Sequence, residues 1–153
     1  MHKAVFFSGN GTAYSRAGSN TDDIDIFPET MSALRFLYKR GYQLVLVTKK
    51  RSEYQQLLFK LLDQALPIMH FNPETDCLQK FAFGQGILIR ESYYISDHTK
   101  MHESFSGCRF ILVLTGNGYC SMAELAEGEM TGLYDISRDI YAAAFSIYSD
   151  NVP

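Results

Sequence analysis

Short apolar runs alternate with helical patterns along this chain, which is typical of β-α-β units and a parallel sheet covered on both faces. Each run holds only a few residues, as buried strands do, and polar or small residues follow most of them. Five strands are predicted, the last more weakly than the others: residues 4–7, 43–48, 93–96, 110–114 and 132–134. The pattern therefore predicts an α/β fold built on a parallel sheet.

Apolar residues at helical spacing lie between these strands. Gly41 ends a helix predicted over residues 28–39. Ser52 and Gln55 can form a capping box at the start of a second helix, whose leucines repeat at helical spacing until Pro67. Shorter helices are predicted over residues 98–106, 121–127 and 137–148.

Length and composition restrict the class of protein. The chain has 153 residues, of which 46% are hydrophobic, and this suits one globular domain over residues 1–153. A net charge of -3 gives no general attraction to nucleic acid or anionic lipid. No apolar run approaches the ~18 residues of a membrane span, and the three cysteines show no CxxC spacing. We expect an unprocessed cytoplasmic protein with neither nucleic-acid nor membrane partners.

Four predicted strands lead into polar loops that read SGNGT, TKKRS, SDHTK and TGNG. In open parallel sheets, ligands bind outside the carboxyl ends of the strands. The loops should therefore meet at one pocket, whose predicted rim is Ser8, Asn10, Thr12, Thr48, Lys49, Asp97 and Thr115.

The order and spacing of these loops resemble the haloacid dehalogenase (HAD) superfamily. The resemblance is narrower to the branch that contains histidinol-phosphate phosphatase and D-glycero-D-manno-heptose 1,7-bisphosphate phosphatase. The family's first motif, DxDGT, corresponds to SGNGT, so Ser8 and Asn10 stand at its two aspartates and Thr12 is kept. Its second motif corresponds to VLVTKK, which implies that Thr48 is the phosphate-binding hydroxyl.

The two remaining motifs extend the resemblance over nearly the whole chain. Lys80 in CLQKF falls at the place of the third-motif lysine. SDHTKM corresponds to the fourth motif, keeping Asp97 and placing Met101 where the last aspartate would be. The resemblance implies a HAD-like Rossmannoid three-layer sandwich, with a central, mainly parallel sheet and no large cap domain.

The substitutions bear on the chemistry that the resemblance implies. In the family the first aspartate attacks phosphorus and binds Mg²⁺, the second is the general acid and base, and the fourth motif completes the metal site. Here Asp97 is the one carboxylate left, so we expect no Mg²⁺ cofactor. Asparagine cannot protonate a leaving group, and a serine nucleophile needs a nearby base, for which His98 and His102 are the local candidates.

The zinc loop of this branch would fall in IMHFNPETDCLQKF. Met69 and Phe71 stand at the first pair of ligand positions, while His70 and Cys77 are one place out of register. A structural zinc needs three or four nitrogen or sulfur ligands, so we expect no zinc cofactor.

Each candidate also has a purely structural interpretation. Gly9 and Gly11 can serve only to turn the chain. Asp97 can cap the helix predicted after the third strand, since carboxylates favour helix N-termini. Lys80 and the basic run at residues 49–51 can be solvated surface.

Three functions from different classes remain. The first, which we favour, is a pseudophosphatase with residual binding of phosphate or a small phosphorylated metabolite through Thr12, Thr48, Lys49, Lys80 and Asp97. The second is an active phosphatase of small phosphorylated metabolites, such as histidinol phosphate or heptose bisphosphate, that uses non-standard residues. The third is an interaction or assembly protein with its surface elsewhere, such as a homo-oligomer.

Overall fold

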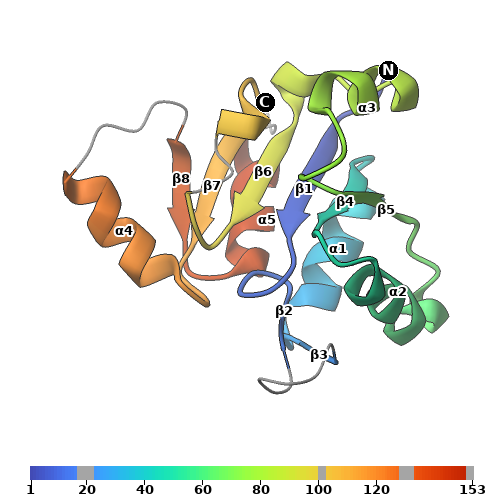
Figure 1. The fold of residues 1–153 in the computed structure, drawn as a ribbon, viewed down its shortest axis with the longest axis horizontal. Helices are drawn as coiled ribbons and strands as arrows, with labels where there is room; N and C mark the ends of the chain where they lie inside the picture. Colours follow the sequence, from blue (N-terminus) through green and yellow to red (C-terminus); the bar gives the residue numbers. More distant parts are fainter. Residues whose placement is uncertain (17–22, 100–102, 128–132, 151–153) are drawn as a thin grey trace.

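The computed structural model describes residues 1–16, 23–99, 103–127 and 133–150. Its centre is a six-stranded sheet with the strand order β5-β4-β1-β6-β7-β8 (Figure 1). Every neighbouring pair in this sheet is parallel, which confirms the predicted α/β fold. The strands are β1 Ala4–Ser8, β4 Gln43–Val47, β5 Ile68–Phe71, β6 Tyr93–Ser96, β7 Arg109–Val113 and β8 Leu133–Ser137.

Helices cover both faces of the sheet and complete three layers (Figure 1). They are α1 Thr30–Lys39, α2 Arg51–Lys60, α3 Leu78–Gln85, α4 Gly118–Glu127 and α5 Ile140–Asp150. Val5 and Phe7 of β1 pack with α1, α2 and α5, whereas Ala4 and Phe6 pack with α3 and α4, because successive residues of a strand face opposite sides. None of these helices, within the described ranges, combines the length and apolar character that a membrane span requires.

The core on the α3 side is built around the ring of Phe6. Its centroid lies 6.2 Å from that of Phe71, 6.1 Å from Phe81 and 5.3 Å from Phe105. Tyr94 stacks on Phe105 with a centroid distance of 4.2 Å. These edge-to-face and stacked contacts bring β1, β5, β6 and α3 together with the short 3₁₀ turn Glu103–Phe105.

A small antiparallel hairpin follows β1 and is separate from the main sheet. It consists of β2 Tyr14–Arg16 and β3 Ile24–Ile26. The Thr30 hydroxyl donates to the Ala13 carbonyl over 2.6 Å and so fixes the hairpin to the start of α1. The hairpin was not predicted from the sequence, and it places β2 beside the loop at the end of β1 (Figure 1).

The prediction of a helix over residues 98–106 is wrong for the part of this segment that the structure describes. Residues 97–99 are bends, and Glu103–Phe105 is a 3₁₀ turn. A local hydrogen bond from a side chain competes with helix formation here, since the Ser96 hydroxyl accepts from the His98 N–H over 3.3 Å. Residues 100–102, including Met101 and His102, lie outside the described residues.

Other predicted boundaries also need correction. The helix expected to run until Pro67 ends at Lys60, and a 3₁₀ turn, Leu62–Gln64, follows it. No side-chain cap is present at its N-terminus, so the Ser52 capping box does not form. Strand β5 and helix α3 were missed, because β5 is an edge strand with two half-buried residues and α3 buries only Leu78 and Ala82.

The aromatic core leads to a prediction about stability. Replacing Phe6 by alanine should lower the free energy of unfolding by about 3–5 kcal/mol, because it removes a fully buried ring from the centre of the cluster. Phe83→Ala is the matched control, since Phe83 is 91% exposed, and it should change stability by less than about 0.5 kcal/mol. Urea unfolding of both variants measures the difference, and equal losses would contradict the packing described above.

Candidate functional site

A cavity of about 300 Å³ lies at the carboxyl end of the sheet, as the sequence analysis expects. Four residues of the predicted rim line it: Ser8, Asn10, Thr48 and Lys49. Four further polar or charged residues, which the sequence analysis did not place on the rim, also line it: Arg16, Glu53, His98 and Asn117. The cavity thus receives groups from the loops after β1, β4, β6 and β7, from β2 and from the first turn of α2.

The other predicted site residues lie elsewhere. Thr12, Asp97 and Thr115 are not in the lining of the cavity. Lys80 is exposed on α3. This helix ends beside the N-terminus, where the His2 N–H donates to the Gly86 carbonyl over 2.7 Å (Figure 1). The structure therefore does not bring Lys80 to the cavity that Ser8 lines.

The loop after β1 turns tightly around Gly9. The Gly9 carbonyl accepts the N–H groups of Thr12 and Ala13 over 3.0 and 2.9 Å. A Cβ at residue 9 would lie 2.1 Å from the Tyr14 hydroxyl, so this close approach requires glycine. The turn brings the Ser8 and Thr12 hydroxyl oxygens within 2.5 Å of each other, and the Ser8 hydroxyl is thereby engaged.

Asp97 is 1% exposed and joins the loops beneath the cavity. Its carboxylate accepts the Asn117 N–H over 2.9 Å and the Thr12 hydroxyl over 3.4 Å. Asp97 does meet a helix N-terminus, but it is that of α4 rather than the predicted helix over residues 98–106. The positive end of α4 favours this carboxylate.

Two glycines make room for the Asp97 carboxylate. A Cβ at Gly11 would lie 2.1 Å from its Oδ2, and one at Gly116 would lie 2.5 Å from the same atom. Gly11 also has a φ of 91°, a conformation that other residues rarely adopt. Glycine is therefore needed at residues 11 and 116 for close packing against Asp97 as well as for turning the chain.

Glu53 forms the charged centre of the cavity wall, with an exposure of 1%. One carboxylate oxygen accepts from the Tyr14 hydroxyl over 2.6 Å, and the other accepts from Arg16 Nε over 3.2 Å. Burial, together with the neighbouring Glu53 charge, raises the pKa of the Tyr14 phenol far above its ordinary value. Tyr14 therefore remains a hydrogen-bond donor, and both oxygens of Glu53 are already bonded.

Tyr94 and His98 also line the cavity. Burial raises the pKa of the Tyr94 phenol, although the Ser96 hydroxyl opposes this effect. The His98 Nδ1 atom is buried and has no hydrogen-bond partner among the residues that the structure describes. The lining therefore includes an imidazole whose Nδ1 atom is not committed to a described partner.

The loop after β4 carries the remaining predicted groups. Lys49 forms an exposed ion pair with Glu74 over 3.2 Å. The Thr48 carbonyl accepts from His70 Nε2 over 2.8 Å, and the His70 ring stacks on Tyr54 with a centroid distance of 4.8 Å. His70 thus holds the Thr48 peptide in place.

The residues present do not fit the Mg²⁺ site that the resemblance implies. Mg²⁺ is usually held by one or two carboxylates together with phosphate oxygens and water. Ser8 and Asn10 are neutral, Asp97 is beneath the cavity, and Glu53 is bonded through both oxygens. Across the described residues, no three His, Cys, Asp or Glu side chains are grouped so that they could hold a metal ion, and this includes the segment around Cys77.

The Glu53 contacts lead to a second stability prediction. Glu53→Ala should lower the free energy of unfolding by about 2 kcal/mol, because it leaves the buried Tyr14 hydroxyl without its acceptor and Arg16 without its partner. Glu74→Ala is the control, since the Lys49–Glu74 pair is about 60% exposed on both sides, and it should cost less than about 1 kcal/mol. Chemical denaturation compares the two, and a loss for Glu74→Ala as large as for Glu53→Ala would contradict this account.

No protein-family model matches this chain, and no curated protein matches it significantly. Solved structures do match. The D,D-heptose 1,7-bisphosphate phosphatase of Burkholderia thailandensis is 20% identical, with a TM-score of 0.76 over 96% of this chain and 99% of that one. The corresponding enzyme of B. bronchiseptica, complexed with magnesium and phosphate, is 17% identical, with a TM-score of 0.74 over 97% and 99% of the two chains.

A third similar structure is the cobalt-bound deoxy-D-mannose-octulosonate 8-phosphate phosphatase of Haemophilus influenzae. It is 16% identical, with a TM-score of 0.66 over 97% of this chain and 85% of that one. Because the identities are 20% or lower, these matches show a shared arrangement of the backbone. The chain therefore has the fold of the HAD-like phosphatases, in the form found in heptose bisphosphate phosphatases.

Proposed function

We propose that this chain is a pseudophosphatase. It binds inorganic phosphate or a small phosphorylated metabolite in the cavity that Ser8, Asn10, Thr48 and Lys49 line, called the Ser8 cavity below, and does not hydrolyse it. The proposal combines the fold with the polar groups at the carboxyl end of the sheet. Proteins with this fold include phosphatases of phosphorylated sugars, one of them complexed with magnesium and phosphate. The cavity of this chain lies at the position where open parallel sheets bind ligands.

The observation that carries the proposal is the position of the carboxylates. Asp97 is buried beneath the cavity, where it accepts hydrogen bonds from Thr12 and Asn117. Glu53 lines the cavity but is engaged by Tyr14 and Arg16. Phosphoryl transfer by the family's route needs a nucleophilic carboxylate, a proton donor and a bound cation. The described lining supplies no uncommitted carboxylate for these tasks.

The same lining retains groups suited to binding an anion. Arg16 and Lys49 carry positive charge. Arg16 is bonded to the buried Glu53, whereas Lys49 has only an exposed, solvent-screened ion pair with Glu74. Thr48 and Asn10 add a hydroxyl and an amide donor. A small phosphate ester would find both charge and hydrogen bonds here, which supports binding without turnover.

One observation favours a second candidate, an active phosphatase with Ser8 as nucleophile. Ser8 and His98 line the same cavity, and the buried His98 Nδ1 lacks a partner among the described residues. A histidine of this kind is a candidate base for a serine. Against this role, the Ser8 hydroxyl pairs with Thr12 at 2.5 Å.

Turnover and binding assays separate the two candidates. The purified protein should show no hydrolysis of p-nitrophenyl phosphate above background with Mg²⁺ present, because the cavity lacks an uncommitted carboxylate nucleophile. It should bind inorganic phosphate in isothermal titration. Hydrolysis that is lost in both Ser8→Ala and His98→Ala would overturn the proposal in favour of the second candidate.

Two lysines provide a matched control for the binding site. Lys49→Met should weaken phosphate binding by about two- to fivefold, the effect of losing one exposed charge contact. Lys80→Met should leave binding unchanged, since Lys80 is exposed on α3 and does not line the cavity. Equal effects of the two variants would show that phosphate binds at another place.

The missing carboxylates can also be restored. The triple variant Ser8→Asp, Asn10→Asp, Met101→Asp should gain Mg²⁺ binding, because residues 8 and 10 already line the cavity. Isothermal titration with Mg²⁺ measures the gain. The control carries asparagine at all three positions, which keeps the size of the side chains but not their charge. Absence of binding in the aspartate variant would show that the motif correspondence is wrong.

A further inference from the structure

Aromatic side chains form a continuous exposed face on α1 and α5, which lie next to each other on the same side of the sheet (Figure 1). Tyr141, Phe145 and Tyr148 follow one another at i, i+4 and i+7 along α5 and are 42%, 55% and 38% exposed. The ring centroid of Phe36, on α1, lies 6.3 Å from that of Tyr141 and 5.6 Å from that of Tyr148. The rings of Phe145 and Tyr148 are 6.3 Å apart, so the aromatic surface extends across both helices.

Opposite charges stand at the two ends of this face. Glu29, the N-cap of α1, already has helical backbone angles, and Phe36 and Arg40 follow it at i+7 and i+11 on the same side of the helix. The Arg40 guanidinium lies over the rings of Phe36 and Tyr148, 3.5 and 4.6 Å from their centroids. Neither Glu29 nor Arg40 forms an ion pair with a residue in the described ranges. The face thus has an acidic end, an aromatic centre and a basic end.

We propose that this face is the interface of a homodimer; it consists of Glu29, Phe36, Arg40, Tyr141, Phe145 and Tyr148 and is called the α1/α5 face below. A two-fold axis that lies in the interface and crosses both helices at right angles sets each helix antiparallel to its own copy. Glu29 of each copy then meets Arg40 of the other, and the aromatic rings pack together between these two ion pairs. The dimer is separate from the function proposed above, since no residue of the α1/α5 face lines the Ser8 cavity.

The distribution of charge selects a second copy as the occupant. An acidic partner would be repelled by Glu29, and a basic partner would be repelled by Arg40. A second copy, turned by the two-fold axis, brings the opposite charge to both residues. Aromatic side chains and arginine are also the residue types that are enriched in protein interfaces relative to the rest of the surface.

The size of the α1/α5 face indicates a weak dimer. The two helices have 10 and 11 residues, so each is about 15–17 Å long. Two helices of this length offer less than the roughly 800 Å² that each partner buries in a standard interface. The association must therefore be measured up to high protein concentration.

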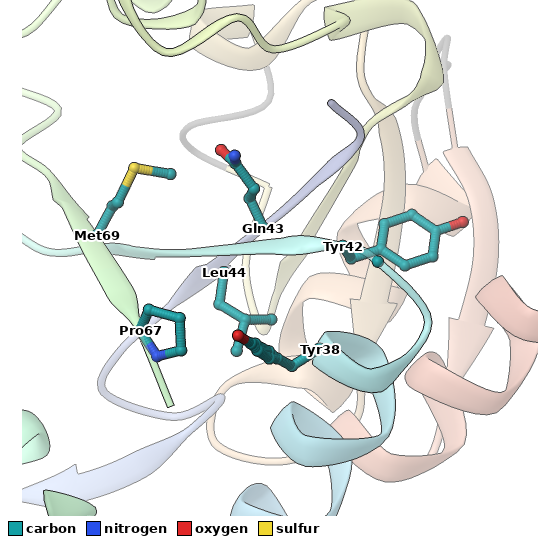
Figure 2. A pocket seen from close by; sticks show the side chains of 7 residues that line it. Tyr38, Tyr42, Gln43, Leu44, Pro67 and Met69 are labelled. Carbon is teal, nitrogen blue, oxygen red and sulfur yellow. The ribbon is translucent and has the colours of Figure 1, made fainter. Parts of the chain in front are cut away.

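Tyr38 is a matched control on the same helix. It lies two residues from Phe36, and this spacing turns its side chain by about 200° around the axis of α1, away from the α1/α5 face. It lines a separate cavity of about 380 Å³ with Leu44 and Pro67, as Figure 2 shows. Tyr38 is 40% exposed and Tyr141 is 42% exposed, so the two tyrosines differ in position rather than in exposure.

Sedimentation velocity tests the aromatic part of the interface. The unmodified protein should show a reversible equilibrium between monomer and dimer at concentrations from about 1 µM to about 1 mM. Tyr141→Ser should weaken the association by about tenfold, because the ring is lost twice from each dimer, whereas Tyr38→Ser should leave it unchanged. A protein that stays monomeric over the whole range, or equal effects of the two variants, would overturn the proposal.

Charge reversal tests the antiparallel arrangement. Glu29→Arg and Arg40→Glu should each weaken self-association by about tenfold, because each variant sets like charges against each other at two places in the dimer. An equimolar mixture of the two variants should associate about as strongly as the unmodified protein, since every arginine then faces a glutamate of the other variant. A mixture that associates no more strongly than the single variants would overturn the proposal. Phosphate titration of the same variants should give the affinity of the unmodified protein, so a failure of the dimer is distinguishable from a failure of the proposed function.

Discussion

The site depends on one buried charge, the carboxylate of Asp97. A charge that is 1% exposed must be compensated inside the protein, and here the Asn117 N–H and the Thr12 hydroxyl do so. These contacts join the loops after β1, β6 and β7. They also require glycine at residues 11 and 116, where any Cβ would collide with the carboxylate. The contacts of Asp97 consequently hold together three of the loops at the carboxyl end of the sheet, where the cavity lies.

For the pseudophosphatase proposed above, these contacts of Asp97 explain how the fold can be kept without the family's set of carboxylates. Several carboxylates at one site repel each other unless a cation lies between them. With Ser8 and Asn10 at the first-motif positions, no such repulsion acts on Asp97. The Ser8 and Thr12 hydroxyls pair instead, and Thr12 in turn donates to Asp97. On the proposed function, the hydrogen bonds among Ser8, Thr12 and Asp97 hold these loops together without a metal.

The sequence predicted the features that depend on local patterns and missed those that depend on packing. Strands β1, β4, β6 and β7 are largely apolar runs. Ser8, Asn10, Thr48 and Lys49, at or after the ends of β1 and β4, line the cavity, whereas Asp97 and Thr115, after β6 and β7, do not. Arg16 and Glu53 are 37 residues apart, and only the packing of the unpredicted hairpin on α2 brings them together. The one local feature of the sequence that could have indicated this pair is the position of Glu53, a carboxylate in the first turn of α2. Lys80 followed the motif order, but order along the chain does not show at which end of the sheet a residue lies.

The two ends of the sheet differ in charge for a reason that lies in the topology. At the carboxyl ends of parallel strands the following helices begin, and their free N–H groups and positive dipole ends favour anions, as α4 does for Asp97. At the amino ends the preceding helices finish, and the carbonyls of their last turns carry partial negative charge. α1 ends in this way beside Gly41. An anion is therefore favoured at the carboxyl end of the sheet, where the cavity lined by Ser8 lies, and disfavoured at the amino end.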